Sequence, residues 1–306
     1  MLEDSRQGTM EVGLLRGLLQ ARSTSGEGRK AMFVGGTDSG KTFLVRQLAD
    51  ELSRSGKRVG VLDFDLGQST VGPPGCIGLQ LPWEEGGDPL FPSAMVFLGF
   101  LSPAFDVGSV IEAGLRLEKR ARELGYDLLL VDTSGMVEGP LAALLKRSKV
   151  RLLRPDLLVL LDREGETGHI LRGLEENSFG ELKRIPPSPE ARRRNREERA
   201  AYRRELYRRY FQGGGELTLD LREVEMVPSS PRLVASPDVL CEGLLVGLND
   251  GEGLTLALAR VVGVGGGKVS LRTPFAGREG DIRAMAVGSS LILEEGTLRF
   301  RPPGDR

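Results

Sequence analysis

The sequence has very few of the residues that bind zinc or carry out histidine chemistry. In 306 residues it has two cysteines, Cys76 and Cys241, and one histidine, His169. The cysteines are far apart and lack the close spacing of a metal site, so we expect two free, buried thiols in a reducing compartment. We expect His169, in the segment GETGHI, to be a surface helix residue rather than a catalyst. This composition excludes a cysteine-histidine zinc site.

Charge of one sign and long apolar runs are also lacking. The chain has 42 Lys and Arg against 43 Asp and Glu, a net charge of −1. This balance excludes a general attraction to nucleic acid or to membranes, so any site for a polyanion must be local. No apolar run is long enough to span a bilayer, and the N-terminal 30 residues carry acids and arginine where a signal peptide needs an apolar stretch. We therefore expect a cytoplasmic protein with no membrane association.

Apolar runs alternate with helical stretches through the first two thirds of the chain. Continuous apolar runs of this kind are typical of strands buried on both faces of a sheet. The alternation predicts an α/β fold, a parallel sheet with helices on both faces and a phosphate site at the carboxyl ends of its strands. The expected strands are 31–36, 58–65, 95–102, 127–134 and 156–163, and the expected helices begin at Lys41 and lie near 109–124 and 140–149.

The sequence pattern changes after the stretch GGGE at residues 213–216. Short β-type runs with many glycines and prolines follow, which is typical of a small antiparallel barrel or sandwich. We predict three parts: an N-terminal helix and linker over residues 1–30, with the helix at about Met10 to Ala21; an α/β domain over 31–213; and a β-rich domain over 214–306.

The stretch GGTDSGKT at residues 35–42 matches the phosphate-binding pattern G-x-x-x-x-G-K-[ST]. It lies between a predicted strand and a predicted helix, as that pattern requires. Backbone N–H groups of such a loop surround the phosphates of a nucleotide, the lysine reaches the β- and γ-phosphates, and the hydroxyl binds Mg²⁺. The pattern predicts a site for ATP and Mg²⁺ formed by Gly35, Gly36, Thr37, Asp38, Ser39, Gly40, Lys41, Thr42 and Phe43.

Acidic residues follow two of the predicted strands. Asp132 ends the run LLLVD, and Asp63 and Asp65 lie in LDFDLGQ. An aspartate at this place is the usual partner of the metal shell, a role that suits Asp132 and that Asp63 can also fill; alternatively, Asp132 only caps the following turn. Asp65 precedes a glycine-rich loop and can act as a general base toward either a hydroxyl acceptor or water.

No guanine-reading N-K-x-D motif follows the run at 156–163, and this absence argues against a GTP switch.

An arginine-rich segment, residues 192–209, has nine arginines against three glutamates. Asn195 and Glu198 form a plausible capping pair, which predicts a helix that begins at Arg196 and leaves Arg194 in the preceding loop. One alternative for this segment is a solvated helix held by salt bridges. One helical face would carry Arg192, Arg196, Arg199 and Arg203 and continue into Leu206 and Tyr210.

Taken together, GGTDSGKT, DFDLGQS followed by PPG, VDTSGMVEG and the arginine segment resemble the polynucleotide 5′-hydroxyl kinase family of P-loop NTPases. Eukaryotic members of that family accompany pre-mRNA cleavage factors and ribosomal-RNA processing. The resemblance covers about residues 31–213, and GLLVGLNDGEGLTLALA resembles the β-rich tail of microbial relatives. It implies Mg²⁺-dependent transfer of the γ-phosphate of ATP, or of another nucleoside triphosphate, to the 5′-hydroxyl of single-stranded or end-exposed RNA or DNA.

The resemblance also implies roles for individual residues. Lys41 and Thr42 would hold phosphate and metal, Asp65 would activate the acceptor, and Gln68 would belong to an acceptor-side loop. The arginine segment would be a lid, with Arg194, Arg199 and Arg203 stabilising the transferring phosphoryl group. Thr133 and Gly135 match a Thr-x-Gly-Trp acceptor clasp in which Met136 replaces the tryptophan. The alternatives are an ATP-binding structural subunit of an RNA-processing assembly and an ATPase switch.

Overall fold

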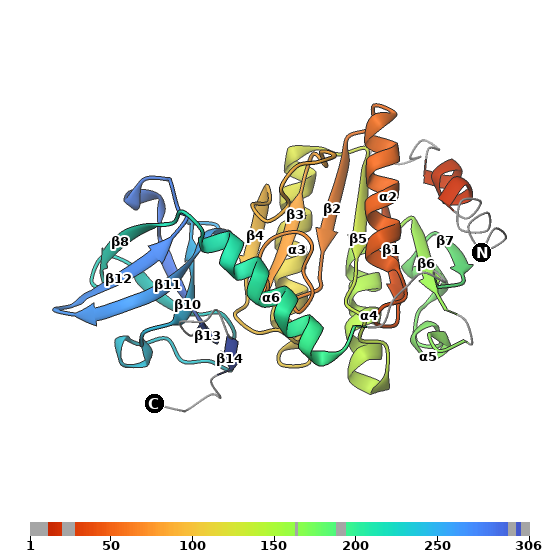
Figure 1. Ribbon diagram of the computed structural model, residues 1–306. Coiled ribbons are helices and arrows are strands. Elements are labelled where there is room, and N and C mark those ends of the chain that lie inside the picture. Colours follow the sequence, from red (N-terminus) through yellow and green to blue (C-terminus); the bar gives the residue numbers. More distant parts are fainter. Residues whose placement is uncertain (1–11, 20–27, 163–164, 188–193, 293–297, 301–306) are drawn as a thin grey trace. The chain divides into compact units, whose positions relative to one another are not determined.

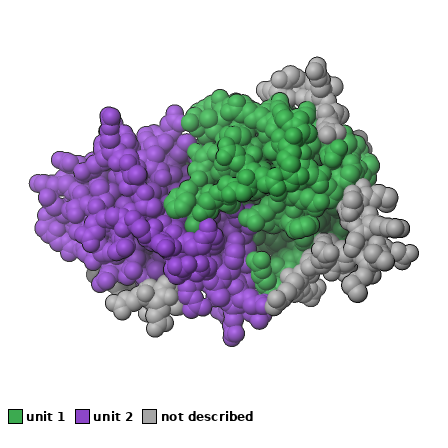
Figure 2. Space-filling model, turned by 45° about the horizontal axis from the view of Figure 1, so that its top comes forward, with its two compact units in different colours: residues 1–65, 79–93, 114–194 green, residues 66–78, 94–113, 195–306 purple. Residues whose placement is uncertain are grey.

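The computed structural model describes residues 12–19, 28–162, 165–187, 194–292 and 298–300 (Figure 1). The chain divides into two compact units whose segments alternate along the sequence (Figure 2). Unit 1 comprises Met1–Asp65, Leu79–Ser93 and Gly114–Arg194. Unit 2 comprises Leu66–Gly78, Ala94–Ala113 and Asn195–Arg306. These bounds do not coincide with the domain boundary expected near residue 213, which stays a prediction.

Unit 1 contains a parallel sheet with the strand order β2-β5-β1-β6-β7. All residues of β2, β5 and β6 are buried, which explains their continuous apolar runs and confirms the predicted parallel α/β fold. The strand β7 was not predicted, because its sequence ELKRI is polar and lacks the apolar run of a buried strand. In the structure most of its residues are half-buried. The bounds are β1 (Arg29–Gly35), β2 (Val59–Asp63), β5 (Leu128–Asp132), β6 (Leu157–Leu161) and β7 (Glu181–Ile185).

Helices flank this sheet. The helix α2 begins at Lys41, as predicted, and buries apolar residues at helical spacing, among them Leu44, Leu48 and Leu52. Both α2 and α4 contact β1, next to which α2 is drawn in Figure 1. Residues 12–19 are helical, and the remainder of the predicted N-terminal helix lies outside the described residues. The bounds are α2 (Lys41–Arg54), α3 (Val107–Leu124), α4 (Gly139–Leu153) and α5 (Gly168–Leu171).

Unit 2 contains a second sheet, with the order β14-β13-β10-β11-β12-β8 and antiparallel pairing between neighbours. The strand β9 pairs in parallel with β13. The antiparallel β-rich part was predicted, and buried residues such as Val246, Leu271 and Met285 form its core. The bounds are β8 (Gly215–Asp220), β9 (Glu225–Pro228), β10 (Leu244–Asn249), β11 (Thr255–Gly265), β12 (Lys268–Thr273), β13 (Ala284–Ile292) and β14 (Leu298–Phe300).

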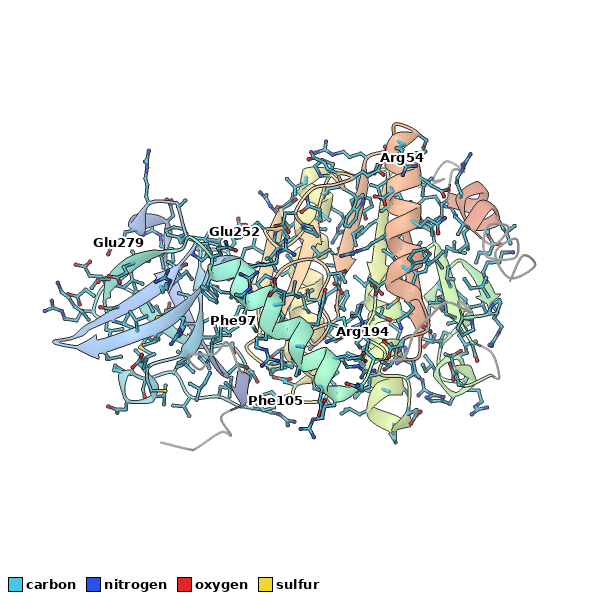
Figure 3. All side chains as sticks on the ribbon, viewed as in Figure 1. Arg54, Phe97, Phe105, Arg194, Glu252 and Glu279 are labelled. Carbon is cyan, nitrogen blue, oxygen red and sulfur yellow. The ribbon has the colours of Figure 1, made fainter. Side chains whose placement is uncertain are left out.

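The strand β4 (Ala94–Phe97) packs on this second sheet. The N–H of Phe97, labelled in Figure 3, donates to Thr255 Oγ1 over 2.9 Å. A Cβ placed on Gly247 would lie 2.9 Å from Phe97 Cβ, so only glycine admits this close approach. A short strand that was not predicted, β3 (Cys76–Gln80), precedes β4 in the sequence. The strand predicted over residues 95–102 is a strand only over its first residues, because β4 ends at Phe97.

The two cysteines are free thiols, as expected. Cys76 is buried, Cys241 is half-buried, and neither forms a disulfide. His169 lies in the short helix α5 and is half-buried rather than on the surface. Throughout the described ranges, no helix has both the length and the apolar character needed to cross a membrane.

Candidate functional site

The loop of residues 35–42 joins the end of β1 to the start of α2. Gly40 has a φ of +89° and Asp38 a φ of +54°, so both adopt the left-handed conformation that glycine tolerates best. A Cβ on Gly35 would lie 2.7 Å from the carbonyl oxygen of Leu161. No side chain of the described residues caps α2, and its first turn has no acidic residue. The positive end of α2 is therefore suited to an anionic ligand.

Lys41 lies over this loop and is 6% exposed. Its Nζ donates to the carbonyl oxygen of Gly36 over 2.7 Å and to Ser39 Oγ over 3.2 Å. Burial lowers the pKa of Lys41, although the charges of Asp132 and Asp65 oppose this shift. The ammonium group is thus held at the phosphate loop by neutral partners, which a phosphate oxygen can replace without breaking an ion pair.

Thr42 and Asp132 meet at the carboxyl end of β5. Thr42 Oγ1 donates to Asp132 Oδ2 over 2.6 Å. Asp132 is 1% exposed, its Oδ1 has no hydrogen-bond partner among the described residues, and burial raises the pKa of its carboxyl. This contact favours the metal-shell role over the alternative in which Asp132 only caps the following turn.

A magnesium ion fits this pair of oxygens. A buried carboxylate oxygen without a partner next to a threonine hydroxyl is the donor set that a hard cation prefers, and a cation would offset the cost of burying the charge. No group of three or more His, Cys, Asp or Glu side chains that could hold a metal occurs within the described residues. The remaining ligands would thus have to be nucleotide phosphates and water, as is usual for Mg²⁺.

Asp63 and Asp65 follow β2 and differ in their surroundings. Asp63 is 1% exposed and lies opposite Asp132 in the register of β2 and β5. Its Oδ1 accepts a hydrogen bond from the N–H of Asp65 over 2.8 Å, so its carboxylate shapes the turn that carries Asp65. Asp65 itself is half-buried. This contact favours a structural task for Asp63 and leaves Asp65 as the accessible carboxylate.

The residues expected to form the acceptor clasp, 133–136, pack against β1 and the phosphate loop. Thr133 is 1% exposed, and its Oγ1 donates to the carbonyl oxygen of Phe33 over 2.7 Å. Thr37 Oγ1 donates to the carbonyl oxygen of Gly135 over 3.3 Å, and a Cβ on Gly135 would lie 2.5 Å from Thr37 Cα. The buried Thr133 side chain therefore bonds the clasp to β1. Met136 is half-buried.

Two lysines of α4, Lys146 and Lys149, are buried, and neither was predicted to belong to the site. Lys146 Nζ donates to Thr133 Oγ1 over 2.9 Å and to the carbonyl oxygen of Ser134. Lys149 Nζ lies 3.9 Å from the centre of the Phe64 ring, a cation–π distance. Burial lowers the pKa of Lys146 well below its ordinary value and that of Lys149 to about 7. The available sequence signal was their spacing of three residues within the helical stretch that follows the clasp.

Asp162 lies after β6, where a guanine-reading N-K-x-D motif would be expected. Groups of its own loop donate hydrogen bonds to its carboxylate. Its carboxylate accepts hydrogen bonds from the N–H groups of Gly165, Glu166 and Thr167 and from Thr167 Oγ1. Arg184 Nη1 adds an ion pair over 3.2 Å. The carboxylate thus stabilises the turn after β6 and is not oriented as a free acceptor toward a nucleobase.

Within unit 2, the helix α6 (Arg196–Phe211) carries two of the three expected lid arginines, Arg199 and Arg203. The acceptor-side loop, residues 66–75, packs against this helix. Gln68 Nε2 donates to the carbonyl oxygen of Arg199 over 3.4 Å. The hydroxyls of Tyr202 and Tyr207 donate to the carbonyl oxygens of Ser69 and Pro74 over 3.0 and 2.7 Å, respectively. The lid helix and the acceptor-side loop therefore belong to one hydrogen-bonded body.

The start of α6 agrees with its prediction. Asn195 and Glu198 form a reciprocal capping box, and the helix begins at Arg196. The residues predicted to share one face of α6 differ in their burial. Leu206 and Tyr210 are buried, Arg199 and Arg203 are half-buried, and Arg196 is exposed. Arg192 lies outside the described residues.

Arg194 lies within unit 1 and touches the phosphate loop. Its N–H donates to Asp38 Oδ2 over 3.0 Å, and its side chain, labelled in Figure 3, is exposed. Asp38 is the residue of the loop that adopts a left-handed conformation without being glycine. The backbone that leads into the lid is thus tied to the nucleotide-binding loop.

A sequence profile of the family described as mRNA cleavage and polyadenylation factor CLP1 P-loop matches residues 35–213, which is more than half of the chain. The chain belongs to this family. The phosphate loop, the acidic strand ends, the clasp and the arginine helix all lie within the CLP1 match.

Several named proteins are similar to this chain in sequence. A polyribonucleotide 5′-hydroxyl-kinase of Pyrococcus horikoshii is 32% identical over 201 residues, 65% of this chain and 54% of the relative. Its namesake in Pyrococcus furiosus is 32% identical and is covered over 56% of its length. The chain thus spans about half the length of these relatives. A protein with the same name in Thermococcus kodakarensis is 29% identical over 87% of this chain and 88% of its own.

Solved structures agree with the CLP1 fold. The structure described as the wild-type Clp1p-Pcf11p complex covers 92% of this chain and 79% of that chain, with a TM-score of 0.73 and 16% identity. At that identity the likeness establishes the fold only.

Proposed function

We propose that this protein is a polynucleotide 5′-hydroxyl kinase that uses ATP, or another nucleoside triphosphate, and Mg²⁺. The observation that carries the proposal is the hydrogen bond from Thr42 to Asp132 beside an intact phosphate loop. It joins the hydroxyl and the carboxylate that a magnesium-nucleotide complex needs. The names of the similar proteins, polyribonucleotide 5′-hydroxyl-kinases, supply the reaction and favour RNA as the acceptor, with DNA as the second candidate.

Residues 35–42 hold the triphosphate in this proposal. Their N–H groups and the end of α2 face its oxygens, and Phe43, 64% exposed, is available to contact the nucleotide. Lys41 exchanges its two neutral partners for the β- and γ-phosphates. Thr42 and Asp132 hold Mg²⁺, with Asp63 as a further candidate ligand; bound there, the ion neutralises charge on the phosphates.

Asp65 acts on the acceptor. Its carboxylate takes the proton of the 5′-hydroxyl while that oxygen bonds to the γ-phosphorus and the bond to the bridging oxygen breaks, which leaves ADP and a 5′-phosphorylated end. The turn held by Asp63 sets the orientation of Asp65. The clasp, with Thr133, Gly135 and Met136, and the loop with Gln68 position the acceptor.

Arg194, Arg199 and Arg203 stabilise the charge of the transferring phosphoryl group. Guanidinium groups are suited to phosphate because they present several donors in a fixed plane. A well-placed arginine contributes roughly 10³- to 10⁵-fold to phosphoryl transfer. The hydrogen bonds that join α6 to the acceptor-side loop support a lid that responds to the acceptor. We place the activity in the cytoplasm, as expected from the sequence.

The test is labelled-phosphate transfer from ATP to matched 5′-hydroxyl RNA and DNA oligonucleotides, with 5′-phosphorylated oligonucleotides as controls. We expect transfer only to the 5′-hydroxyl ends. ATP hydrolysis that is independent of an oligonucleotide would favour an ATPase switch instead. ATP binding without turnover would favour a structural subunit of an RNA-processing assembly.

A further inference from the structure

The buried face of α4 contains two lysines among apolar residues. Lys146 is 0% exposed and Lys149 is 1% exposed, on the same face as Leu145 and Val150. Burying an ammonium group costs several kcal/mol unless its partners compensate. Leucine or methionine would fill the same space at lower cost, so the presence of lysine calls for an explanation other than packing.

Lys146 reaches two acceptors of the clasp at once. Its Nζ donates to Thr133 Oγ1 over 2.9 Å and to the carbonyl oxygen of Ser134. Both acceptors are neutral, and burial together with the charges of Lys149 and Lys41 disfavours the protonated form of Lys146. The interaction therefore resembles a double hydrogen bond to one backbone segment more than a stabilising ion pair.

Residues of three elements, α4, β1 and the phosphate loop, form hydrogen bonds with the clasp. Lys146 holds Thr133 and Ser134 from α4, and Thr133 Oγ1 in turn donates to Phe33 in β1. Thr37 in the phosphate loop donates to the carbonyl oxygen of Gly135 over 3.3 Å. Side chains that orient a binding segment through hydrogen bonds set its position to within a fraction of an ångström.

We propose that Lys146 is a positioning residue that orients the clasp, residues 133–136, for the 5′-end of the acceptor polynucleotide. The inference rests on the proposed function for the identity of the ligand. Lys146 is 0% exposed, and it would act on the acceptor through Thr133 and Ser134. Its loss should therefore impair acceptor binding while the nucleotide site, which Lys41 and Thr42 form, stays intact.

The test compares Lys146→Met with the matched control Lys149→Met, which removes an equally buried lysine of the same helix that does not bond to the clasp. For Lys146→Met we expect the KM for a 5′-hydroxyl oligonucleotide to rise roughly 10-fold or more, since small misplacements of a binding segment are costly. The KM for ATP should stay within about threefold of wild type in both variants. Lys149→Met should leave the acceptor KM within about threefold of wild type. Equal acceptor KM values for the two variants would overturn the inference.

Hydrogen exchange of the ligand-free protein gives a readout that does not depend on activity. Residues 133–136 should lose protection in Lys146→Met and keep it in Lys149→Met. Thr133→Val, alone and combined with Lys146→Met, completes a double-mutant cycle, in which the two losses should not add because both break one contact. If the wild type transfers no phosphate, the proposed function fails, and unchanged clasp protection in Lys146→Met would separately overturn the positioning role.

Discussion

Thr42 Oγ1 lies 2.6 Å from Asp132 Oδ2, so the first turn of α2 and the end of β5 share one hydrogen bond at the proposed metal site. Asp132→Asn keeps the shape but removes the charge that a cation needs. We expect the affinity for ATP in the presence of Mg²⁺ to fall by roughly 10-fold, with partial recovery at high Mg²⁺. Calorimetric titrations of ATP with and without Mg²⁺ measure this affinity and its dependence on Mg²⁺. The exposed Asp238→Asn is the control, and an unchanged Mg²⁺ dependence would remove Asp132 from the metal site.

Lys41→Ala should abolish phosphate transfer. The variant leaves the carbonyl oxygen of Gly36 and Ser39 Oγ without their donor and leaves the charge on the β- and γ-phosphates unmatched. Transfer is measured in single turnover with saturating ATP. Lys119→Ala, in which an exposed lysine is removed, should behave like the wild type. A Lys41→Ala rate within about threefold of wild type would contradict the phosphate-binding role.

Asp65→Asn tests the proposed general base. The side chain keeps its size, and the backbone hydrogen bond from residue 65 to Asp63 is preserved. We expect phosphate transfer to fall roughly 10²- to 10⁴-fold, the usual contribution of general-base assistance, while ATP affinity changes little. Rates at several Mg²⁺ concentrations separate the roles, because recovery by excess Mg²⁺ would assign Asp65 to the metal instead.

Arg199→Ala and Arg203→Ala should each reduce kcat more than they weaken oligonucleotide binding, if the guanidinium groups act on the transition state. Arg208→Ala is the matched control, since Arg208 lies on the exposed side of the same helix and pairs with Glu205 over 2.7 Å. Binding is followed by fluorescence anisotropy and kcat by single-turnover transfer. Equal losses of binding and of rate would indicate a passive basic surface.

Lys149→Met should change how stability depends on pH. Burial, opposed by the charges of Asp65, Asp63 and Asp132, lowers the pKa of Lys149 to about 7. The unfolded chain keeps this proton up to about pH 10, so it binds more protons than the folded state above pH 7, and the wild type gains stability as pH rises. The variant lacks this gain.

The wild type should therefore gain at least about 1 kcal/mol relative to Lys149→Met between about pH 7 and pH 9. Denaturant unfolding at each pH measures the difference in free energy. The exposed Lys119→Met should show no such trend relative to the wild type. A constant difference between Lys149→Met and the wild type would mean that Lys149 titrates in the same range in both states.

Several features were predictable because their signals are local. The phosphate loop needs glycines at fixed spacing between a strand and a helix, and α2 does begin at Lys41. The capping pair Asn195 and Glu198 placed the start of α6 at Arg196. In contrast, β3 and β7 carry short or polar sequences whose pairing depends on distant strands, so no local pattern marked them.

The sequence by itself determined the class of the fold, the phosphate loop and membership of the CLP1 family, because each depends on residue spacing along one segment. Only the tertiary structure gave the hydrogen-bond partners of the acids whose roles the sequence left open. It directs Asp63 to the N–H of Asp65 and Asp132 to Thr42. It also buries Lys146 beneath Thr133, which no spacing rule predicts. Burial and hydrogen-bond partners depend on which elements come together in space, and that is a property of the whole folded chain.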